Sequence, residues 1–207
     1  MSAILKQILV PPDNYCYIIY SASGKAAVVD PGMDDTQALY FIEEKNLNLL
    51  YIIATHHHMD HTYSIKHMKK VVPSASVVAS RIDGERLDVP VDVTVEDNDS
   101  LDLDRFTLSF ILTPGHTKGS ICVLVDEEAL LTGDTLFIGD CGRTDLPGGD
   151  PEEMYYSLHE KIMKLPGRLI VYPGHDYGDK PYDTLENQIR CNKTLRAKSY
   201  REFLAIP

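Results

Sequence analysis

The stretch IIATHHHMDHT, residues 52–62, places four histidines and one aspartate directly after a run of apolar residues. Histidine supplies only 8 of the 207 residues, so the pattern H-x-H-x-D-H arises by chance in about one such chain in a thousand. On an extended backbone, residues two apart share a face, so His56 and His58 can present two imidazoles to one ion while His57 points away. If a helix follows, Asp60 and His61 are aimed at a neighbouring point, which suggests a pair of metal ions.

Two metals need more ligands, and three later segments supply them. His116 stands in TPGHTKGS, Asp134 in LTGDTLF and His175 in YPGHDYG. Both histidines follow Pro-Gly, whose restricted and permissive dihedral angles favour a sharp turn that exposes the imidazole. Imidazole and carboxylate ligands together suit Zn²⁺, Fe²⁺ or Mn²⁺.

The remaining chain reads as strands alternating with helices. Apolar and β-branched runs bounded by turn residues predict strands over 15–20, 25–30, 47–55, 75–80, 91–97, 105–112, 121–126, 129–134 and 168–176. Helical spacing and capping residues predict helices over 34–46, 63–71, 150–165 and 182–192. A hairpin is expected to begin the fold, and 47–55 is apolar enough for a buried central strand. The candidate ligands follow strand ends, where loops held by a rigid sheet converge.

Bulk composition limits the classes of partner. With 207 residues, 43% hydrophobic and 25% charged, the chain fits one globular α/β domain over residues 1–207. Its net charge of −11 argues against nucleic acid, which requires clustered basic residues. No apolar run reaches the length of a membrane span. Four dispersed cysteines and an N-terminus without a signal-peptide pattern favour reduced thiols and a cytoplasmic location.

Four segments in order, THHHMDH, PGHTKGS, GDTLF and YPGHDYG, resemble the metallo-β-lactamase fold superfamily. The resemblance implies a four-layer αββα sandwich with the site at one edge of two facing sheets. It also implies the ligands: His56, His58 and His116 on one metal, Asp60, His61 and His175 on a second, and Asp134 bridging. A dinuclear site of Zn, Fe or Mn supplies hydroxide for hydrolysis, with Asp60 as the catalytic residue that holds or accepts the water proton.

The segment GDCGRTDL is similar to the glyoxalase II (hydroxyacylglutathione hydrolase) and persulfide dioxygenase branches. That resemblance makes Arg143 a candidate clamp for an anionic thiol substrate, although an ion pair with Asp145 or Asp150 is an alternative. The favoured reaction is hydrolysis of a thioester such as S-D-lactoylglutathione. The alternative is oxidation of glutathione persulfide by a single Fe²⁺, for which the implied ligands are His56, His116 and Asp134.

Several residues keep two interpretations at this point. Asp30 in VVDPG either orients a ligand or forms a turn. Cys141 is expected to be a packed small residue rather than a nucleophile. Three further histidines are expected to be surface or hydrogen-bonded residues: His57, His67 and His159. A homodimer is compatible with the exposed edges of such sandwiches, but no interface can be located.

Overall fold

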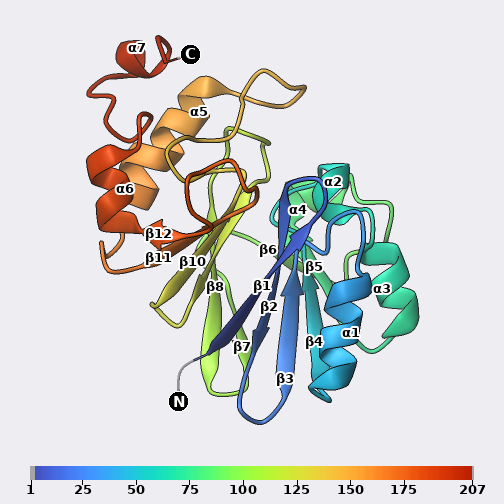
Figure 1. Ribbon diagram of the computed structural model, residues 1–207. Helices are drawn as coiled ribbons and strands as arrows, with labels where there is room; N and C mark the ends of the chain where they lie inside the picture. The colour runs from blue at the N-terminus through green and yellow to red at the C-terminus, as the bar shows by residue number, and fades with distance from the viewer. Residues whose placement is uncertain (1–2, 207) are drawn as a thin grey trace.

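Two six-stranded sheets pack face to face in the computed structural model, which describes residues 3–206 (Figure 1). The first sheet has the strand order β1 (Ile4–Val10), β2 (Asn14–Tyr20), β3 (Lys25–Val29), β4 (Asn48–Ile53), β5 (Ser76–Ser80) and β6 (Val93–Val95). The second has the order β12 (Asp183–Thr184), β11 (Ile170–Pro173), β10 (Ala129–Gly133), β9 (Ile121–Val125), β8 (Phe106–Leu112) and β7 (Ser100–Leu103).

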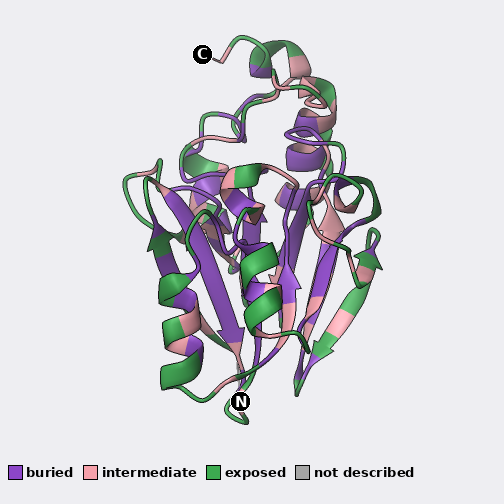
Figure 2. Cartoon of the chain, turned by 90° about the vertical axis from the view of Figure 1, so that its right-hand side faces the viewer, coloured by how far each residue is buried: buried purple, intermediate pink, exposed green. Residues whose placement is uncertain are grey.

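Helices cover the outer face of each sheet. Beside the first sheet lie α1 (Thr36–Glu44), α2 (Met59–Thr62), α3 (Ile65–Val71) and α4 (Arg81–Gly84). Beside the second lie α5 (Pro151–Tyr156), the π turn η1 (Ser157–Lys161), the 3-10 turn η2 (Ile162–Lys164) and α6 (Leu185–Cys191), and α7 (Tyr200–Phe203) packs on α5 near the C-terminus. The strands are largely buried and the outer helical faces exposed, as Figure 2 shows.

Three apolar cores separate these four layers. Alternation along β2 sends Ile18 toward α1 and α3, and Ile19 toward the second sheet, because successive side chains of a strand point to opposite faces. Phe110 of β8 lies in the same central core as Ile19. Met154 and Leu158 pack with the outer face of the second sheet in the third core. The predicted αββα sandwich is therefore confirmed.

Parallel pairing determines where the loops meet. β4 lies between β3 and β5 and is parallel to both, so their carboxyl ends share one edge of the first sheet. β10 and β11 are likewise parallel in the second sheet. The segments that follow β4, β10 and β11 carry the histidine cluster, Asp134 and His175. The topology thus brings ligand-bearing loops to the same end of the sandwich.

The structure corrects several predicted elements. β1 precedes the expected first hairpin and pairs antiparallel with β2; it is an edge strand with an irregular, half-exposed pattern. β7, α4 and α7 were not predicted, and β12 follows the segment predicted as the last strand. The helix predicted over 150–165 is α-helical only to Tyr156, where Ser157 donates a hydrogen bond to the Pro114 carbonyl, 2.7 Å away. Within residues 3–206, no helix has the length and hydropathy to cross a membrane.

Candidate metal centre

All seven predicted ligand side chains come together at one end of the sandwich. They come from the loop after β4, from α2, and from the segments that follow β8, β10 and β11. Two triads bring their ligand atoms within 4.8 Å of one another: His56, His58 and His116, and Asp60, His61 and His175. Residues separated by more than a hundred positions therefore meet in the arrangement that the motifs predict.

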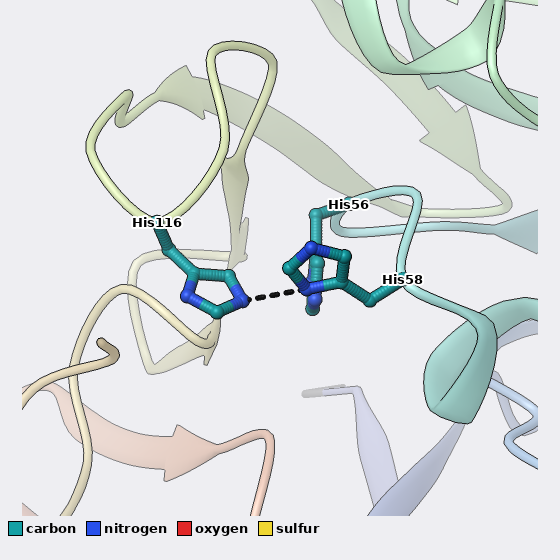
Figure 3. Close-up of side chains that lie close together, drawn as sticks. All are labelled: His56, His58 and His116. Atoms are coloured by element: carbon teal, nitrogen blue, oxygen red, sulfur yellow. Dashed lines mark hydrogen bonds between the residues drawn. The ribbon is translucent and has the colours of Figure 1, made fainter. Parts of the chain in front are cut away.

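The first triad is made of imidazoles alone. His116 Nε2 lies 2.8 Å from His58 Nδ1, and His56 points toward the same space (Figure 3). His56 is buried, and its Nε2 has no hydrogen-bond partner. Because an unpaired buried polar atom is costly, this nitrogen fits a metal ligand better than a packing residue.

The second triad combines a carboxylate with two imidazoles. His61 Nε2 lies 3.2 Å from His175 Nε2, and Asp60 Oδ2 lies 3.4 Å from His175 Nε2. Asn14, at the start of β2, donates its Nδ2 proton to Asp60 Oδ2 at 3.1 Å. Three atoms able to bind a cation thus face one another, and the Asn14 amide holds the carboxylate in place.

Asp134 stands between the triads. Its Oδ1 lies 3.3 Å from His61 Nε2, while its Oδ2 lies 3.3 Å from His175 Nε2 and 3.5 Å from His116 Nε2. The residue is buried, and Oδ1 has no hydrogen-bond partner. One carboxylate reaching both triads fits the bridging position that the family resemblance implies.

Hydrogen bonds on the outer side fix the imidazoles. Carboxylates and carbonyls accept but do not donate, so each Nδ1 that faces one carries a proton, and the Nε2 of the same ring is the atom directed at the centre, where it can bind a metal once it carries no proton. This holds for His61, His116 and His175, whose Nδ1 atoms donate to Asp30 Oδ2 at 2.9 Å, the Arg143 carbonyl at 2.7 Å and Asp13 Oδ1 at 3.1 Å. The donor set and its orientation therefore fit divalent cations such as Zn²⁺ or Fe²⁺.

Asp30 orients ligands in addition to ending β3. Its carboxylate accepts from the Thr55 backbone N–H at 2.8 Å, from the Thr55 hydroxyl at 2.6 Å and from His61. The Thr55 hydroxyl also lies 3.1 Å from His56 Nδ1. The orienting interpretation of Asp30 thus accounts for contacts to both triads, one direct and one through Thr55.

Asp83, which no motif marks as a site residue, connects two loops that carry candidate ligands. It lies buried on α4, and its Oδ2 accepts from the His57 backbone N–H at 2.9 Å, from His57 Nδ1 at 2.9 Å and from the Thr117 hydroxyl at 2.7 Å. Its Oδ1 accepts from the Gly119 N–H at 2.9 Å. His57, as expected, points away from the metal centre, and its role is to anchor the loop.

Burial and nearby charges shift the pKa values of the imidazoles in opposite directions in the two triads. Burial lowers the pKa of His56 well below its ordinary value and that of His58 to about 4, and neighbouring histidines add to the effect. Burial acts in the same direction on His61 and His175, but Asp134 outweighs it, together with other nearby carboxylates. The pKa of His61 is therefore raised well above its ordinary value, and that of His175 to about 9.

A cavity of about 510 Å³ opens over the metal centre. Ligand side chains form its floor, and Phe137, Leu146 and Tyr177 contribute to its wall. The Tyr177 ring stacks on His175, with centroids 4.6 Å apart and planes inclined by 9°. A small molecule that enters this cavity meets the candidate ligands directly.

Four residues of the segment GDCGRTDL line the cavity: Asp140, Cys141, Arg143 and Leu146. The Arg143 guanidinium is held by Asp145 through two hydrogen bonds of 2.7 Å, whereas Asp150 caps α5 instead. Burial raises the pKa of the Cys141 thiol to about 12, so the cysteine offers no thiolate near neutral pH. His67 and His159 lie outside the site, hydrogen-bonded to Asp35 and to the Thr194 carbonyl.

Comparisons with known proteins agree with this geometry. Residues 10–175 match the metallo-beta-lactamase superfamily. The mitochondrial persulfide dioxygenase ETHE1 of Bos taurus is 36% identical, covering 98% of this chain and 80% of the relative. The hydroxyacylglutathione hydrolase of Pelagibacter ubique is 38% identical over 80% of this chain and 67% of the relative.

Solved structures give the same relationship. ETHE1 from Myxococcus xanthus superposes with a TM-score of 0.88 at 30% sequence identity, covering 99% of this chain and 92% of that one. Sequence, topology and the gathered histidines and carboxylates lead to one conclusion. The chain belongs to the metallo-beta-lactamase superfamily of metal-dependent enzymes.

Proposed function

We propose that the chain is a mononuclear Fe²⁺ persulfide dioxygenase that oxidises a small-molecule persulfide such as glutathione persulfide. The sequence alone favoured a thioester hydrolase, and the comparisons reverse that order. The observation that carries the change is the extent of the likeness. The similarity to persulfide dioxygenase covers nearly the whole chain, whereas that to the Pelagibacter hydrolase covers a smaller part.

His56, His116 and Asp134 would hold the iron. The two buried polar side-chain atoms of this centre that lack a hydrogen-bond partner, His56 Nε2 and Asp134 Oδ1, both belong to this set. Two histidines and one carboxylate leave coordination positions open, and iron bound in this way supplies chemistry with thiolates and oxygen. This ligand set is part of the proposal and is supported by the unpaired His56 Nε2 and by the 3.5 Å distance between Asp134 Oδ2 and His116 Nε2.

The surrounding side chains would prepare the cavity for such a substrate. Phe137, Leu146 and Tyr177 place apolar surface beside the metal ligands, which limits water around a reactive sulfur. Arg143 lies at the cavity with its guanidinium exposed. Asp145 takes two of its five N–H donors, and a carboxylate of the substrate could bind the others or compete for these two. Cys141 stays a neutral thiol, so we assign it no covalent role.

Thioester hydrolysis by a dinuclear centre is the second candidate, and one observation favours it. Asp60, His61 and His175 form a complete second ligand set beside Asp134. In that reaction two metals would activate a water molecule. Asp60 would hold that water as a hydrogen-bond acceptor, because its lowered pKa keeps the carboxylate ionised: burial opposes the shift, but the hydrogen bond from His175 and the charge of His61 outweigh it.

Metal content and substrate turnover separate the two functions. The purified protein would be analysed for metals per chain, and then assayed for oxygen uptake on glutathione persulfide and for hydrolysis of S-D-lactoylglutathione. One iron per chain with oxygen uptake is the expected result, and H116A should lose both. H159A, which removes a histidine outside the centre, should lose neither. Two metals with rapid hydrolysis and no oxygen uptake would favour the second candidate.

A further inference from the structure

A second cavity of about 760 Å³ lies beside the metal cavity. It is bounded by α2, α3 and the segment after α4, and we call it the side cavity. Met59 lines both cavities. Of the residues that follow it, Asp60 lines the metal cavity, and Thr62 and Tyr63 line the side cavity. The two spaces are therefore adjacent, with the single turn of α2 between them.

Positive charge gathers around the side cavity of a chain whose net charge is −11. Lys66, Lys70 and Arg86 line it, and Asp88 is the one carboxylate among the lining residues that the structure describes. Lys66 pairs with Asp88 at 3.0 Å. Lys70 and Arg86 have no carboxylate partner within residues 3–206. Two cations therefore remain uncompensated.

Arg86 of the side cavity also approaches two loops that carry residues of the metal centre and its cavity. Its Nη1 lies 3.4 Å from His57 Nε2, and a Cβ built on Gly148 would lie 3.6 Å from the same nitrogen. His57 lies between two candidate metal ligands in sequence, and Gly148 lies two residues after Leu146 of the metal-cavity wall. A guanidinium in this position can attract an anion toward the metal centre.

Arg143, at the metal cavity, differs from Lys70 and Arg86 because it already has a carboxylate partner. Asp145 already accepts hydrogen bonds from two of the five N–H donors of Arg143, and its negative charge offsets that of the guanidinium. Lys70 and Arg86 have no such carboxylate in an ion pair within the described residues. Between the two places, the side cavity offers an anion the larger net attraction.

We propose that the side cavity binds the anionic end of the thiol substrate, a carboxylate or a phosphate, while the substrate's sulfur lies in the metal cavity. The proposal rests on the proposed function, because it assumes that the substrate is a thiol derivative. The four residues of α2 span about 6 Å, whereas an extended tripeptide spans about 10 Å. A molecule of that size can pass over Met59 and reach both cavities. Tyr63 and Leu87 offer apolar surface to its carbon chain.

The first test removes the two uncompensated cations together, in K70Q/R86Q. We expect the KM for glutathione persulfide to rise about tenfold while kcat changes less than twofold. The persulfide of 2-mercaptoethanol, which carries no anionic group apart from the persulfide itself, should show less than a twofold change in KM. K164Q, which removes a lysine that lines neither cavity, serves as the control. An unchanged KM for glutathione persulfide, or an equal rise for both substrates, would overturn the proposal.

A binding measurement separates this proposal from the proposed function. Glutathione and coenzyme A, titrated calorimetrically into the metal-loaded protein, represent the carboxylate and the phosphate. At least one should bind, with a Kd about tenfold weaker in K70Q/R86Q. If such binding is found but no persulfide supports oxygen uptake, the proposed function fails and the side cavity stands. If neither compound binds, or the variant binds both as tightly as wild type, the side cavity fails even in an active dioxygenase.

Discussion

Replacing Asp83 by asparagine tests how far the metal loops depend on a carboxylate outside both ligand triads. The side chain accepts four hydrogen bonds, three at Oδ2 and one at Oδ1. An asparagine amide keeps most of them if its NH₂ group faces the Gly119 N–H, which then loses its acceptor. An unsatisfied buried donor costs about 1–3 kcal/mol, and weakening the charge-assisted bonds costs about 1 kcal/mol more. We expect the free energy of unfolding to fall by roughly 2–4 kcal/mol.

Urea unfolding of the metal-free protein measures this change. D88N is the matched control, because Asp88 is 94% exposed and its ion pair with Lys66 lies at the surface. Its loss should cost at most about 1 kcal/mol. If D83N unfolds with the same free energy as D88N, the hydrogen bonds of Asp83 do not hold the loops as argued.

Metal affinity gives a second measurement on the same variant. Asp83 fixes the backbone of His57, whose two neighbours in sequence are candidate ligands, and it also fixes the loop that carries His116. Loss of outer hydrogen bonds around metal ligands typically weakens binding about 10- to 100-fold. Competition with a chelator should show that D83N binds the metal about tenfold more weakly than wild type. Wild-type affinity in D83N would refute the positioning role.

The effect of Asp83 on stability should also depend on pH. Burial alone would raise the pKa of this carboxyl, but hydrogen bonds from His57 and Thr117 outweigh it and lower the pKa. A group whose pKa is lower in the folded state stabilises the fold above its unfolded pKa, about 3.9 for aspartate. This stabilisation is lost as the pH falls through the folded pKa. The difference between wild type and D83N should therefore be full at pH 6 and should shrink as the pH falls below about 4.

Three further predictions address the metal centre and its cavity. H116A should lose iron, whereas H175A should retain most of it if one ion is bound by the proposed set; equal loss in elemental analysis would contradict that set. A Cβ at Gly174 would collide with the Asp134 carboxylate, so G174A should lower the metal content at least tenfold, and full metal content would contradict the close packing. Because burial raises the pKa of Cys141 to about 12, iodoacetamide at pH 8 should alkylate the exposed Cys191 first, which peptide mass spectrometry can check.

The sequence predicted those parts of the fold that local patterns determine. The apolar run over 47–55 became β4, with parallel neighbours on both sides, and Asp150 followed by Pro151 does begin α5. β1 was not predicted because an edge strand is only partly buried. Its apolar residues therefore do not alternate with polar ones in the pattern that marks a strand with one buried face. The helix over 150–165 was predicted too long because its irregularity at Ser157 coincides with a tertiary contact to Pro114.

The candidate ligands could be predicted from the sequence, but the residues that hydrogen-bond to them or to their loops could not. Histidines and aspartates at strand ends, with Pro-Gly before His116 and His175, form short motifs whose geometry is local. Asp13 and Asp83 act through contacts that only the tertiary structure creates: Asp13 meets His175 across 162 residues, and Asp83 meets Gly119 across 36. No spacing rule connects such pairs, so a carboxylate that orients a ligand resembles any other polar residue in the sequence.

The opposite pKa shifts of the two triads should give them different affinities for a first metal ion. With their pKa values lowered, His56 and His58 are neutral at pH 7 and bind a cation without releasing a proton. His61 and His175, with raised pKa values, hold protons that a metal must displace. The first ion should therefore bind beside His56, and a second should bind more weakly as the pH falls. The same ligands can then serve a one-metal or a two-metal enzyme, and the proton affinity of the second triad helps to determine which forms.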